Sequence, residues 1–443
     1  MTQQLPADAE RPTGVRWRVF ALACGTSWLL YFHRYTFALI KPELQDDWGL
    51  NADELGLLDS AFYTCYALFQ MPLGIAADVW GVRLVLTLLV LVWSGGLWLQ
   101  AFASSVKILA VARGLLGLGQ SAVYACLSRV TRNWFPANLR TSLQGWIGVF
   151  FGRVGGLSAN LMLGALLMGT LGVDWRTVLY ACAGVGAAHA GLVWYVFRDR
   201  PCEHPGTNRA EIGLIAGDNG AGAGAPDSRW TIRRLWKTTS GRSLANLLAL
   251  NLQTILSTAA DTLYSDWIPL FLKNVYLFDS QQRGLMSALP LLGGAIGGTL
   301  GGWLNDVLIR KTGDLRRGRR IVGVGSKGIA AVLLLGALLA FDRPVVFCTL
   351  LFFVKFFSDS GLATTWGTVT DIGGKATASV FAFNNAVAGI GSVIAPAVFG
   401  AMAAQFGWRP VFVAAAGCYL LCGLSWLLID PRIPLVQETN QRG

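Results

Sequence analysis

The sequence has few charged residues for its length. Only 14% of its 443 residues are Asp, Glu, Lys or Arg, whereas 53% are hydrophobic. A soluble globular protein has about 25% charged residues. Windows of apolar residues long enough to cross a hydrocarbon layer, which takes about 20 residues, recur from end to end. The shortage of charge excludes a soluble globular protein and predicts a polytopic helical membrane protein.

Histidine and the common catalytic motifs are also scarce. The chain has three dispersed histidines, His33, His189 and His204, and it has no HExxH, GxSxG or GxxxxGKS/T sequence. The eight cysteines occur singly, without a CxxC pair. We therefore expect no enzyme, no metal site and no cofactor. Without a P-loop, any accumulation of a solute must use an ion or substrate gradient.

The apolar windows predict an all-α membrane protein with about twelve transmembrane helices. The expected spans are roughly residues 17–40, 51–77, 83–104, 107–132, 139–168, 174–197, 242–273, 281–309, 319–341, 344–371, 374–404 and 408–429. Such a chain lies in the lipid bilayer, and we expect it in the plasma (inner) membrane.

Basic residues are concentrated in alternate loops, although the formal net charge of +11 might suggest a nucleic-acid partner. The rich loops hold groups such as Arg129, Arg132 and Arg140, and the intervening loops hold single residues such as Lys41 and Lys107. This is the positive-inside pattern, which places both termini and the long central loop in the cytoplasm. We expect no nucleic-acid partner.

The two halves of the chain resemble each other. WRTVLYACAGVG, which begins at Trp175, aligns with WRPVFVAAAGCY, which begins at Trp408. The predicted domains are an N-terminal six-helix bundle at 1–200, a cytoplasmic linker at 201–241 and a C-terminal six-helix bundle at 242–443. The linker ends in RWTIRRLWKTTSGR, which favours a short interfacial helix. Pseudo-symmetric bundles imply alternating access around a site between the halves, for which a monomer suffices.

A loop motif in the first half resembles the signature of the major facilitator superfamily. The segment GIAADVWGVR supplies Gly74, Asp78, Gly81 and Arg83 of the pattern GxxxDxxGxR, and Asp306 lies in the corresponding segment GGWLNDVLIRK. The resemblance implies a gating role, in which the loop carboxylate caps or pairs with neighbouring helix ends.

Longer stretches resemble the anion:cation symporter branch of that superfamily, which includes hexuronate and galactonate permeases and vesicular glutamate transporters. The most specific of them are EHPGTNRAE and WLNDVLIRKTGDLRRGRR, and others are SAFYTCYALFQMPLGIAAD, ARGLLGLGQSAVYACLSRVTRNWFP and VFAFNNAVAGIGSVIAP. The resemblance implies transport of a small organic anion, with protons as the coupling ion.

Arg34 lies inside the first apolar run, where an arginine costs at least ~2.5 kcal/mol. No carboxylate occurs at adjacent helical spacing, and a guanidinium binds carboxylate, phosphate or sulfonate through two parallel hydrogen bonds. Relatives in the branch carry a substrate-binding arginine at this position. The alternative is a salt bridge to an acid on another span, with Asp59 as the best candidate.

The fourth span contains a second matching arginine and a departure from the branch. Arg113 matches an arginine that holds substrate or couples the proton, or else bonds backbone carbonyls structurally. Seven residues on, Gln120 replaces the usual Glu and cannot carry a proton. His33 lies where symporting relatives often have an acid, and imidazole titrates near neutrality.

Other ionisable residues offer alternative proton carriers or substrate contacts. Asp59 is one candidate carrier. Lys355 and Asp359, four residues apart, form either a carrier or a static intramembrane ion pair. Arg153, where relatives have a small residue, favours a dianionic substrate unless it pairs with Asp261 or Asp266 of the seventh span.

Polar aromatic and amide side chains complete the predicted substrate site. Asn384 and Asn385 match a substrate-facing stretch of the eleventh span in relatives. The tyrosines expected to bond substrate are Tyr31, Tyr63, Tyr66 and Tyr124. Lys327 is expected to snorkel from a helix end to the cytoplasmic surface.

The sequence therefore predicts a secondary transporter that takes up a small organic anion with protons. One alternative is an antiporter that exchanges phosphorylated or sulfonated anions, because the usual Glu is missing and Arg153 is added. A third possibility is a transporter-like sensor that binds a ligand without moving it.

Overall fold

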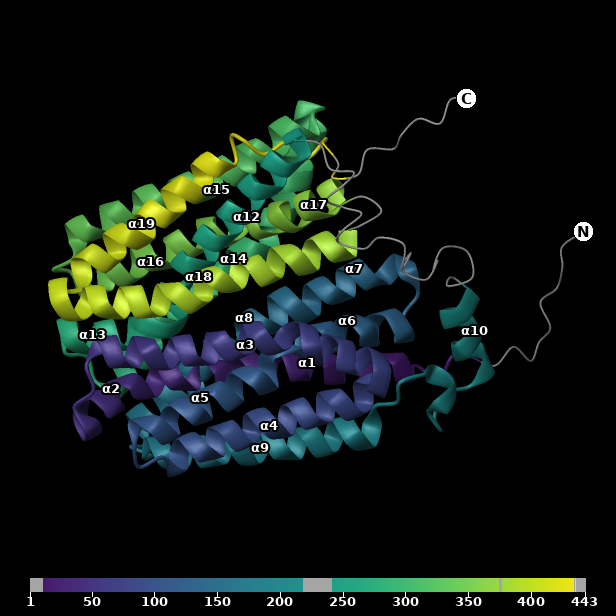
Figure 1. Cartoon of the computed structure of the whole chain (residues 1–443), viewed down its shortest axis with the longest axis horizontal. Helices are drawn as coiled ribbons and strands as arrows, with labels where there is room; N and C mark the ends of the chain where they lie inside the picture. The colour runs from purple at the N-terminus through teal and green to yellow at the C-terminus, as the bar shows by residue number, and fades with distance from the viewer. Residues whose placement is uncertain (1–10, 218–240, 374–376, 434, 436–443) are drawn as a thin grey trace, which may run out of the picture. The chain divides into compact units, whose positions relative to one another are not determined.

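The computed structural model describes residues 11–217, 241–373, 377–433 and 435, and every regular element in that part of the chain is a helix (Figure 1). The all-α prediction is thereby confirmed for those residues. Most of the predicted linker, including its interfacial helix, falls at 218–240 and lies outside the described residues. The cytoplasmic placement of the termini stays a prediction.

The first half of the chain contains long helices with several interruptions. In chain order its elements are α1 (Val15–Arg34), α2 (Thr36–Trp48), α3 (Ala52–Trp80), α4 (Val82–Phe102), α5 (Val106–Ser121), α6 (Val123–Trp134), α7 (Ala137–Gly145), η1 (Trp146–Phe151), α8 (Gly152–Ala159), η2 (Asn160–Thr170), α9 (Trp175–Val196), η3 (Pro201–Glu203) and α10 (Arg209–Gly217). Of these, η1 and η2 are π-helical, a local form that often occurs at functional sites.

The second half repeats this plan. Its elements are α12 (Gly241–Thr262), η4 (Leu263–Trp267), α13 (Ile268–Tyr276), α14 (Ser280–Thr312), α15 (Leu315–Ala337), η5 (Leu338–Ala340), α16 (Pro344–Ser360), α17 (Leu362–Gly373), α18 (Thr377–Phe406) and α19 (Trp408–Ser425). The π-helical η4 joins α12 to α13, and Gly361 separates α16 from α17.

Nine helical stretches in the described residues are long and apolar enough to cross a membrane. They correspond to the third to sixth and the eighth to twelfth expected spans. The helices of the other three expected spans, α1, α3 and α12, are 20, 29 and 22 residues long but are not among the nine. The prediction of about twelve spans is confirmed for nine.

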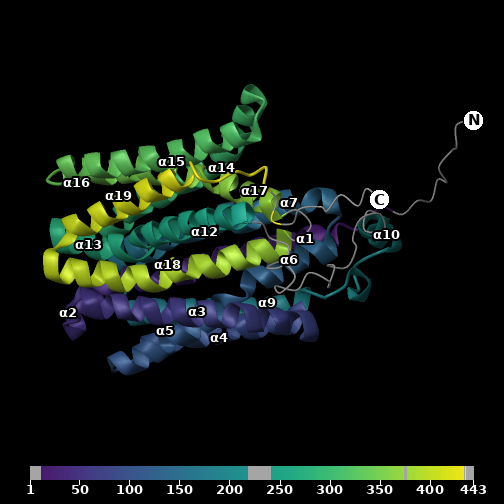
Figure 2. The ribbon, with the colours of Figure 1, turned by 45° about the horizontal axis from the view of Figure 1, so that its top comes forward.

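The described residues form two compact units. The first consists of 11–33, 65–155 and 179–217, and the second consists of 34–64, 156–178 and the residues from 241 onward. In the first unit α4 packs along α5. In the second, α12 runs beside α18 (Figure 2), and α15 packs on α16 and α19. Each unit is built from discontinuous segments, so the predicted domain boundaries at 200 and 242 are not tested by them and stay a prediction.

Small residues bring α14 and α16 together in the second unit. A Cβ atom added to Gly293, Gly297 or Gly301 would lie 2.1, 2.0 or 2.0 Å from a backbone carbonyl oxygen of α16. These glycines are four residues apart, so they share one face of α14 and allow backbone contact.

Polar caps define several helix starts. The Asp279 carboxylate accepts a hydrogen bond from the Gln282 N–H at 2.8 Å and begins α14, and Asp314 accepts one from the Arg316 N–H at 2.8 Å and begins α15. Such caps satisfy backbone donors that the helix leaves unpaired.

Candidate functional site

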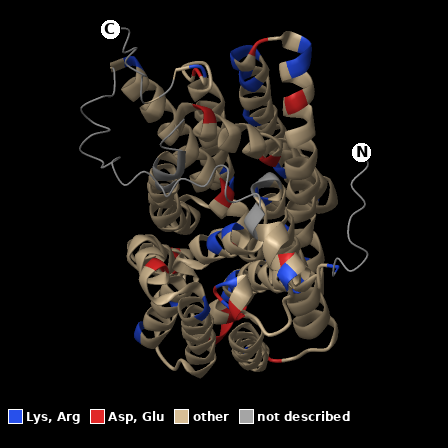
Figure 3. Ribbon diagram, turned by 90° about the vertical axis from the view of Figure 1, so that its right-hand side faces the viewer, with Lys and Arg blue, Asp and Glu red and all other residues tan. Residues whose placement is uncertain are grey.

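Charged residues lie within the helices as well as at their ends (Figure 3). Each unit holds polar clusters inside an otherwise apolar bundle.

In the first unit, α1, α6 and α8 bring two predicted substrate tyrosines together. The rings of Tyr31 and Tyr124 have centroids 6.4 Å apart. The Tyr124 hydroxyl lies 2.8 Å from the Ser27 hydroxyl, which donates to the carbonyl of Ile147 at 2.6 Å. A Cβ on Gly152 would lie 2.9 Å from the Tyr31 ring, so glycine at this position lets α8 approach α1.

The two departures from the branch pattern, His33 and Gln120, are both buried in the first unit. The indole N–H of Trp93 donates to Nδ1 of His33 at 3.2 Å. The side-chain amide of Gln120 donates to the carbonyl of Leu30 at 3.1 Å, so it binds the backbone of α1. A carboxamide neither gains nor loses a proton in the physiological pH range, so Gln120 cannot act as a proton carrier.

The predicted arginines occupy three different helices. Arg113 is buried on α5, and Arg153 is partly buried on α8. Arg34 is the last residue of α1, where the helix is interrupted before α2. In the second unit the Arg34 guanidinium carbon lies 5.3 Å from the ring centroid of Phe62, a cation–π distance.

A buried ionic cluster in the second unit joins α2, α3 and η4. The Lys41 ammonium donates to the Asp59 carboxylate and, at 2.7 Å, to the carbonyl of Asp266. It also lies 3.8 Å from the ring centroid of Trp267. The Tyr63 hydroxyl donates to the Asp266 carboxylate at 3.2 Å. Our placement of Lys41 in a loop was wrong, because α2 continues through it to Trp48 and its side chain is 0% exposed.

A second buried ionic cluster lies between α12 and α16. The Lys355 ammonium is 2.7 Å from the Asp261 carboxylate and 2.8 Å from that of Asp359. The Tyr419 hydroxyl of α19 also donates to Asp261, at 3.3 Å. The ion pair predicted from the four-residue spacing is therefore present, while its role in coupling stays a prediction.

Lys327 is not a snorkelling residue, and that expectation was wrong. Its side chain is 5% exposed and lies twelve residues into α15, or about 18 Å along the axis at 1.5 Å per residue. Its ammonium donates to the hydroxyls of Ser257 at 2.7 Å and Ser358 at 3.0 Å. The hydropathy pattern of α15 did not indicate that Lys327 is buried, because a buried lysine and a snorkelling lysine near a predicted helix end have the same local sequence.

The paired asparagines of α18 differ in their surroundings. Asn384 is buried, and its amide donates to the side chains of Asn251 at 2.9 Å and Thr254 at 3.1 Å, both on α12. Asn385 is exposed. Tyr66 is partly buried on α3. The contacts of Asn384 place it beside a polar face of α12.

The loop motif forms contacts within the first unit. Asp78 pairs with Arg129 of α6. The N–H groups of Val82 and Arg83 donate to the Asp199 carboxylate at 2.6 and 3.1 Å, so a residue outside the motif caps α4.

The two motif glycines differ, because Gly81 makes a close contact and Gly74 does not. Gly81 has φ +90°, and a Cβ there would lie 2.8 Å from Asp199. At Gly74 a Cβ would meet Ala125 at an ordinary 3.7 Å. In the corresponding segment of the second half, Asp306 is exposed and accepts a hydrogen bond from the Asn305 amide at 3.3 Å.

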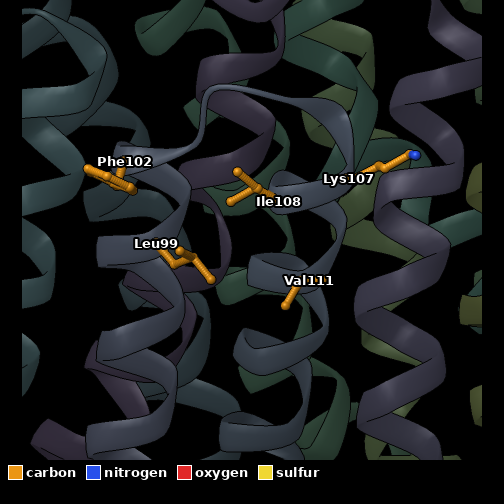
Figure 4. A pocket seen from close by; sticks show the side chains of 5 residues that line it. All are labelled: Leu99, Phe102, Lys107, Ile108 and Val111. Carbon is orange, nitrogen blue, oxygen red and sulfur yellow. The ribbon is translucent and has the colours of Figure 1, made fainter.

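No group of three or more His, Cys, Asp and Glu side chains suited to a metal ion occurs among the described residues. An apolar surface hollow lies between the end of α4 and the start of α5, lined by Leu99, Phe102, Lys107, Ile108 and Val111. Figure 4 shows the Lys107 ammonium pointing away from the other four side chains. This hollow contains none of the predicted site residues.

The chain belongs to the Major Facilitator Superfamily, whose family model matches residues 23–371 and 250–443. Members of this family are transporters, so the chain is a multi-pass membrane transporter and not an enzyme. The fold agrees with solved transporters. A bacterial homologue of the human lysosomal transporter Spinster has a TM-score of 0.74 at 17% identity, over 93% of this chain and 98% of that chain.

Among curated proteins, the chain is 29% identical to the probable sulfoacetate transporter SauU of Cupriavidus necator, over 97% of each chain. It is 25% identical to the D-galactonate transporter of Escherichia coli O6:H1, over 96% of this chain and 98% of the relative. It is also 25% identical to the hexuronate transporter of Escherichia coli K12, over 96% and 97%. These relatives match the anion:cation symporter branch that the loop sequences resemble.

Proposed function

We propose that the protein is a secondary transporter that carries a small organic anion across the plasma (inner) membrane by alternating access, in symport with protons. The substrate belongs to the class of sugar acids, carboxylates and sulfonates. Both termini face the cytoplasm, and the monomer is the functional form.

The observation that carries this proposal is the set of cations placed inside helices. Arg34 ends α1 beside Phe62, and Arg113 is buried on α5. A buried guanidinium is costly in a bilayer and is retained where it serves a function. Its planar fork matches carboxylate and sulfonate oxygens, and relatives of this chain are named as transporters of sulfoacetate, galactonate and hexuronates.

The predicted site combines these arginines with polar neighbours. Tyr31 and Tyr124 lie together in the first unit, and Asn384 of α18 contacts the polar face of α12 in the second. We assign them, with Arg153, Tyr63, Tyr66 and Asn385, to recognition of the substrate's acidic and hydroxyl groups.

Proton coupling requires a group that takes up and releases a proton in each cycle. The candidates are His33, Asp59 and the pair of Lys355 and Asp359. Asp59 contacts Lys41 and Asp359 contacts Lys355, so protonation of either carboxylate would weaken its contact with the ammonium group. Such a weakening would link proton binding to helix movement.

Anion exchange is a second candidate function, favoured by the hydrogen bond that fixes Gln120 to the carbonyl of Leu30. Because this amide replaces the usual glutamate, the branch's common proton carrier is absent. An exchanger needs no proton site, since the returning anion resets the transporter.

Uptake of labelled anions into proteoliposomes tests both functions. The panel contains sulfoacetate, D-galactonate and D-galacturonate, each with and without an inward proton gradient and with and without internal anion. Stimulation by the proton gradient alone supports symport. Uptake that does not depend on the proton gradient and requires internal anion supports exchange. Binding of a panel anion without flux would indicate a sensor.

A further inference from the structure

The Lys327 cluster suggests a binding group that neither the sequence patterns nor the relatives' names assign. We propose that Lys327, together with Ser257 and Ser358, binds an acidic group of the transported anion, and that the preferred substrate therefore carries two acidic groups. This inference rests on the proposed function and specifies its substrate class.

Two buried lysines of the second unit, Lys327 and Lys355, differ in their partners. Lys355 contacts two carboxylates, those of Asp261 and Asp359, at 2.7 and 2.8 Å. Lys327 is equally enclosed, yet among the described residues no carboxylate lies within 4 Å of its ammonium. Both neighbouring acids thus serve Lys355, and Lys327 is solvated by neutral groups.

The neutral groups around Lys327 are the hydroxyls of Ser257 and Ser358. Ser257 and Ser358 accept hydrogen bonds from the ammonium, and a serine hydroxyl can donate a hydrogen bond as well as accept one. The ammonium has three N–H donors, of which the two serines accept two. The cluster thus presents several donors and a positive charge, which suits an oxygen of a carboxylate or sulfonate.

The charge of the Lys327 ammonium is costly while only hydroxyl groups contact it. An ammonium buried among hydroxyls in a membrane protein lacks the compensation that a contacting anion provides. The Tyr419 ring, whose centroid lies 5.3 Å from the Lys327 nitrogen, supplies only a partial counterbalance. An acidic group of the substrate would supply the missing contact.

The Lys327 cluster includes a face of α12 that a predicted substrate residue, Asn384 of α18, also contacts. Asn251, Thr254 and Ser257 are spaced three residues apart on α12, so they lie on one side of the helix. Asn384 donates to the first two, and Lys327 donates to the third. The side chains of Ser257 and Thr254 are only partly buried.

The test compares anions that differ by one acidic group. Galactarate and D-galactonate differ in having a carboxylate or a hydroxymethyl group at one end, and sulfoacetate and acetate differ by a sulfonate. Binding to the purified full chain is measured by intrinsic fluorescence and by the ligand-dependent shift in unfolding temperature, and uptake is measured in proteoliposomes. We expect the wild type to bind the two-acid member of each pair at least tenfold more tightly.

Lys327→Gln is expected to lower affinity for the two-acid member by at least tenfold and to change affinity for the one-acid member less than threefold. Ser257→Ala keeps the lysine and should reduce the preference by threefold to tenfold, which also tests the proposal if Lys327→Gln fails to fold. Lys107→Gln, at the exposed start of α5, is the control and should match the wild type.

The outcomes separate this inference from the proposed function. A wild type that prefers one-acid anions, or a preference unchanged in Lys327→Gln and Ser257→Ala, would overturn the inference while transport of organic anions stands. If no panel anion binds or moves, both the proposed function and the inference are wrong.

Discussion

The surroundings of basic side chains differ among four helical positions of the second unit, Arg34, Lys41, Lys327 and Lys355. Arg34 lies beside an aromatic ring, Lys41 and Lys355 contact carboxylates, and Lys327 contacts hydroxyls. Removing Lys41 or Lys355 would leave acidic partners buried, a change that costs about 3–5 kcal/mol. Lys327, whose ammonium contacts hydroxyls, is therefore the better of these lysines at which to test ligand binding.

Replacing Arg34 by glutamine should abolish most transport, because a neutral amide cannot compensate the charge of an anion. Charge-assisted hydrogen bonds contribute about 1.5–3 kcal/mol, so kcat/KM for uptake should fall by about tenfold to a hundredfold. Arg34→Lys should be intermediate, since it keeps the charge and loses the fork. Initial uptake rates in proteoliposomes measure this, and unchanged rates in Arg34→Gln would remove Arg34 from the site.

The sequence predicted only part of this residue-level arrangement. The contact between Lys355 and Asp359 followed from their four-residue spacing, which is a local property of a helix. Lys41 and Lys327 were misplaced because apolar windows end at charged residues, so a buried lysine is assigned to a boundary. Their partners come from other helices, and a single sequence contains no direct signal of such contacts.

At the scale of helices, three expected spans fall short of the apolarity that identifies the other nine. α1 carries His33 and Arg34, α3 carries Asp59 and Tyr63, and α12 bears the polar face that ends at Asp261. These charged and polar residues lower the hydropathy of the three helices, whereas other predicted site residues, such as Arg113 on α5 and Asn384 on α18, lie in helices that are among the nine. Charged and polar residues that serve a function lower the mean hydropathy of a helix, and mean hydropathy is the property from which a membrane span is predicted.

The glycine face of α14 leads to a stability prediction. In Gly297→Ala the new methyl group would meet the Phe356 carbonyl oxygen, at 2.0 Å in the present backbone, so α14 and α16 must separate. Such overpacking costs about 1–3 kcal/mol. Gly336→Ala on α15 meets nothing within 4 Å, and alanine's higher helix propensity should make it neutral or slightly stabilising.

Thermal unfolding in detergent distinguishes these two substitutions. A lower unfolding temperature for Gly297→Ala, and not for Gly336→Ala, is the expected result. Equal unfolding temperatures would mean that the two helices are not in backbone contact.

The junction of α10 with α1 leads to a prediction about pH. The Glu211 carboxylate accepts hydrogen bonds from the Thr13 hydroxyl and from the N–H groups of Val15 and Arg16, at 3.2 and 3.0 Å. Burial alone would raise the pKa of Glu211, but these hydrogen bonds outweigh it and lower the pKa below its ordinary value. The stabilisation is therefore complete above the ordinary pKa of about 4.3 and is lost as the pH falls through the lowered pKa.

Glu211→Gln should consequently unfold at a lower temperature than the wild type at pH 7, and the difference should disappear at pH values below the lowered pKa. Glu203→Gln serves as the control, because Glu203 is exposed and makes only local contacts within η3. A difference that persists unchanged into strong acid would show that Glu211 acts through packing alone.

At the scale of the whole molecule, alternating access requires some packed layers to separate in each cycle. Within the second unit, α2 and the start of α3 are held to the later helices by several polar contacts. Lys273 pairs with Asp46 at 2.5 Å, Arg283 pairs with Glu43 at 2.6 Å, and Ser60 donates to the carbonyl of Val393 at 2.8 Å. Lys41 and Tyr63 add their bonds to Asp266.

Tyr63→Phe removes one of these contacts while keeping the ring. It should favour separation of α2 and the start of α3 from the later helices of the second unit. A hydrogen bond to a carboxylate contributes about 1.5–3 kcal/mol, so the separated state should gain at least tenfold in population. A cysteine at Ser60, in a background where Cys65, Cys202 and Cys418 are replaced, should react correspondingly faster with a membrane-impermeant thiol reagent. Tyr276→Phe, whose hydroxyl bonds the carbonyl of Phe341, should leave the rate unchanged.

Whole-chain features were the most predictable from sequence. Helical class and family follow from composition and from loop motifs that are long enough to be specific. The grouping of 34–64 with the residues from 241 onward was not predictable, because it depends on contacts such as that of Lys41 with the Asp266 carbonyl, which join segments 225 residues apart.

The pair formed by Lys41 and Asp59 also has a consequence for the evolution of the sequence. Either residue alone would be a buried charge without its contacting counter-ion, so a lineage that loses one is placed under selection to lose the other. Among homologous sequences, lysine at the first position and aspartate at the second should therefore appear and disappear together, and intermediates should be rare. The contact between Lys41 and Asp59 would then be visible among homologues as a pair of linked substitutions.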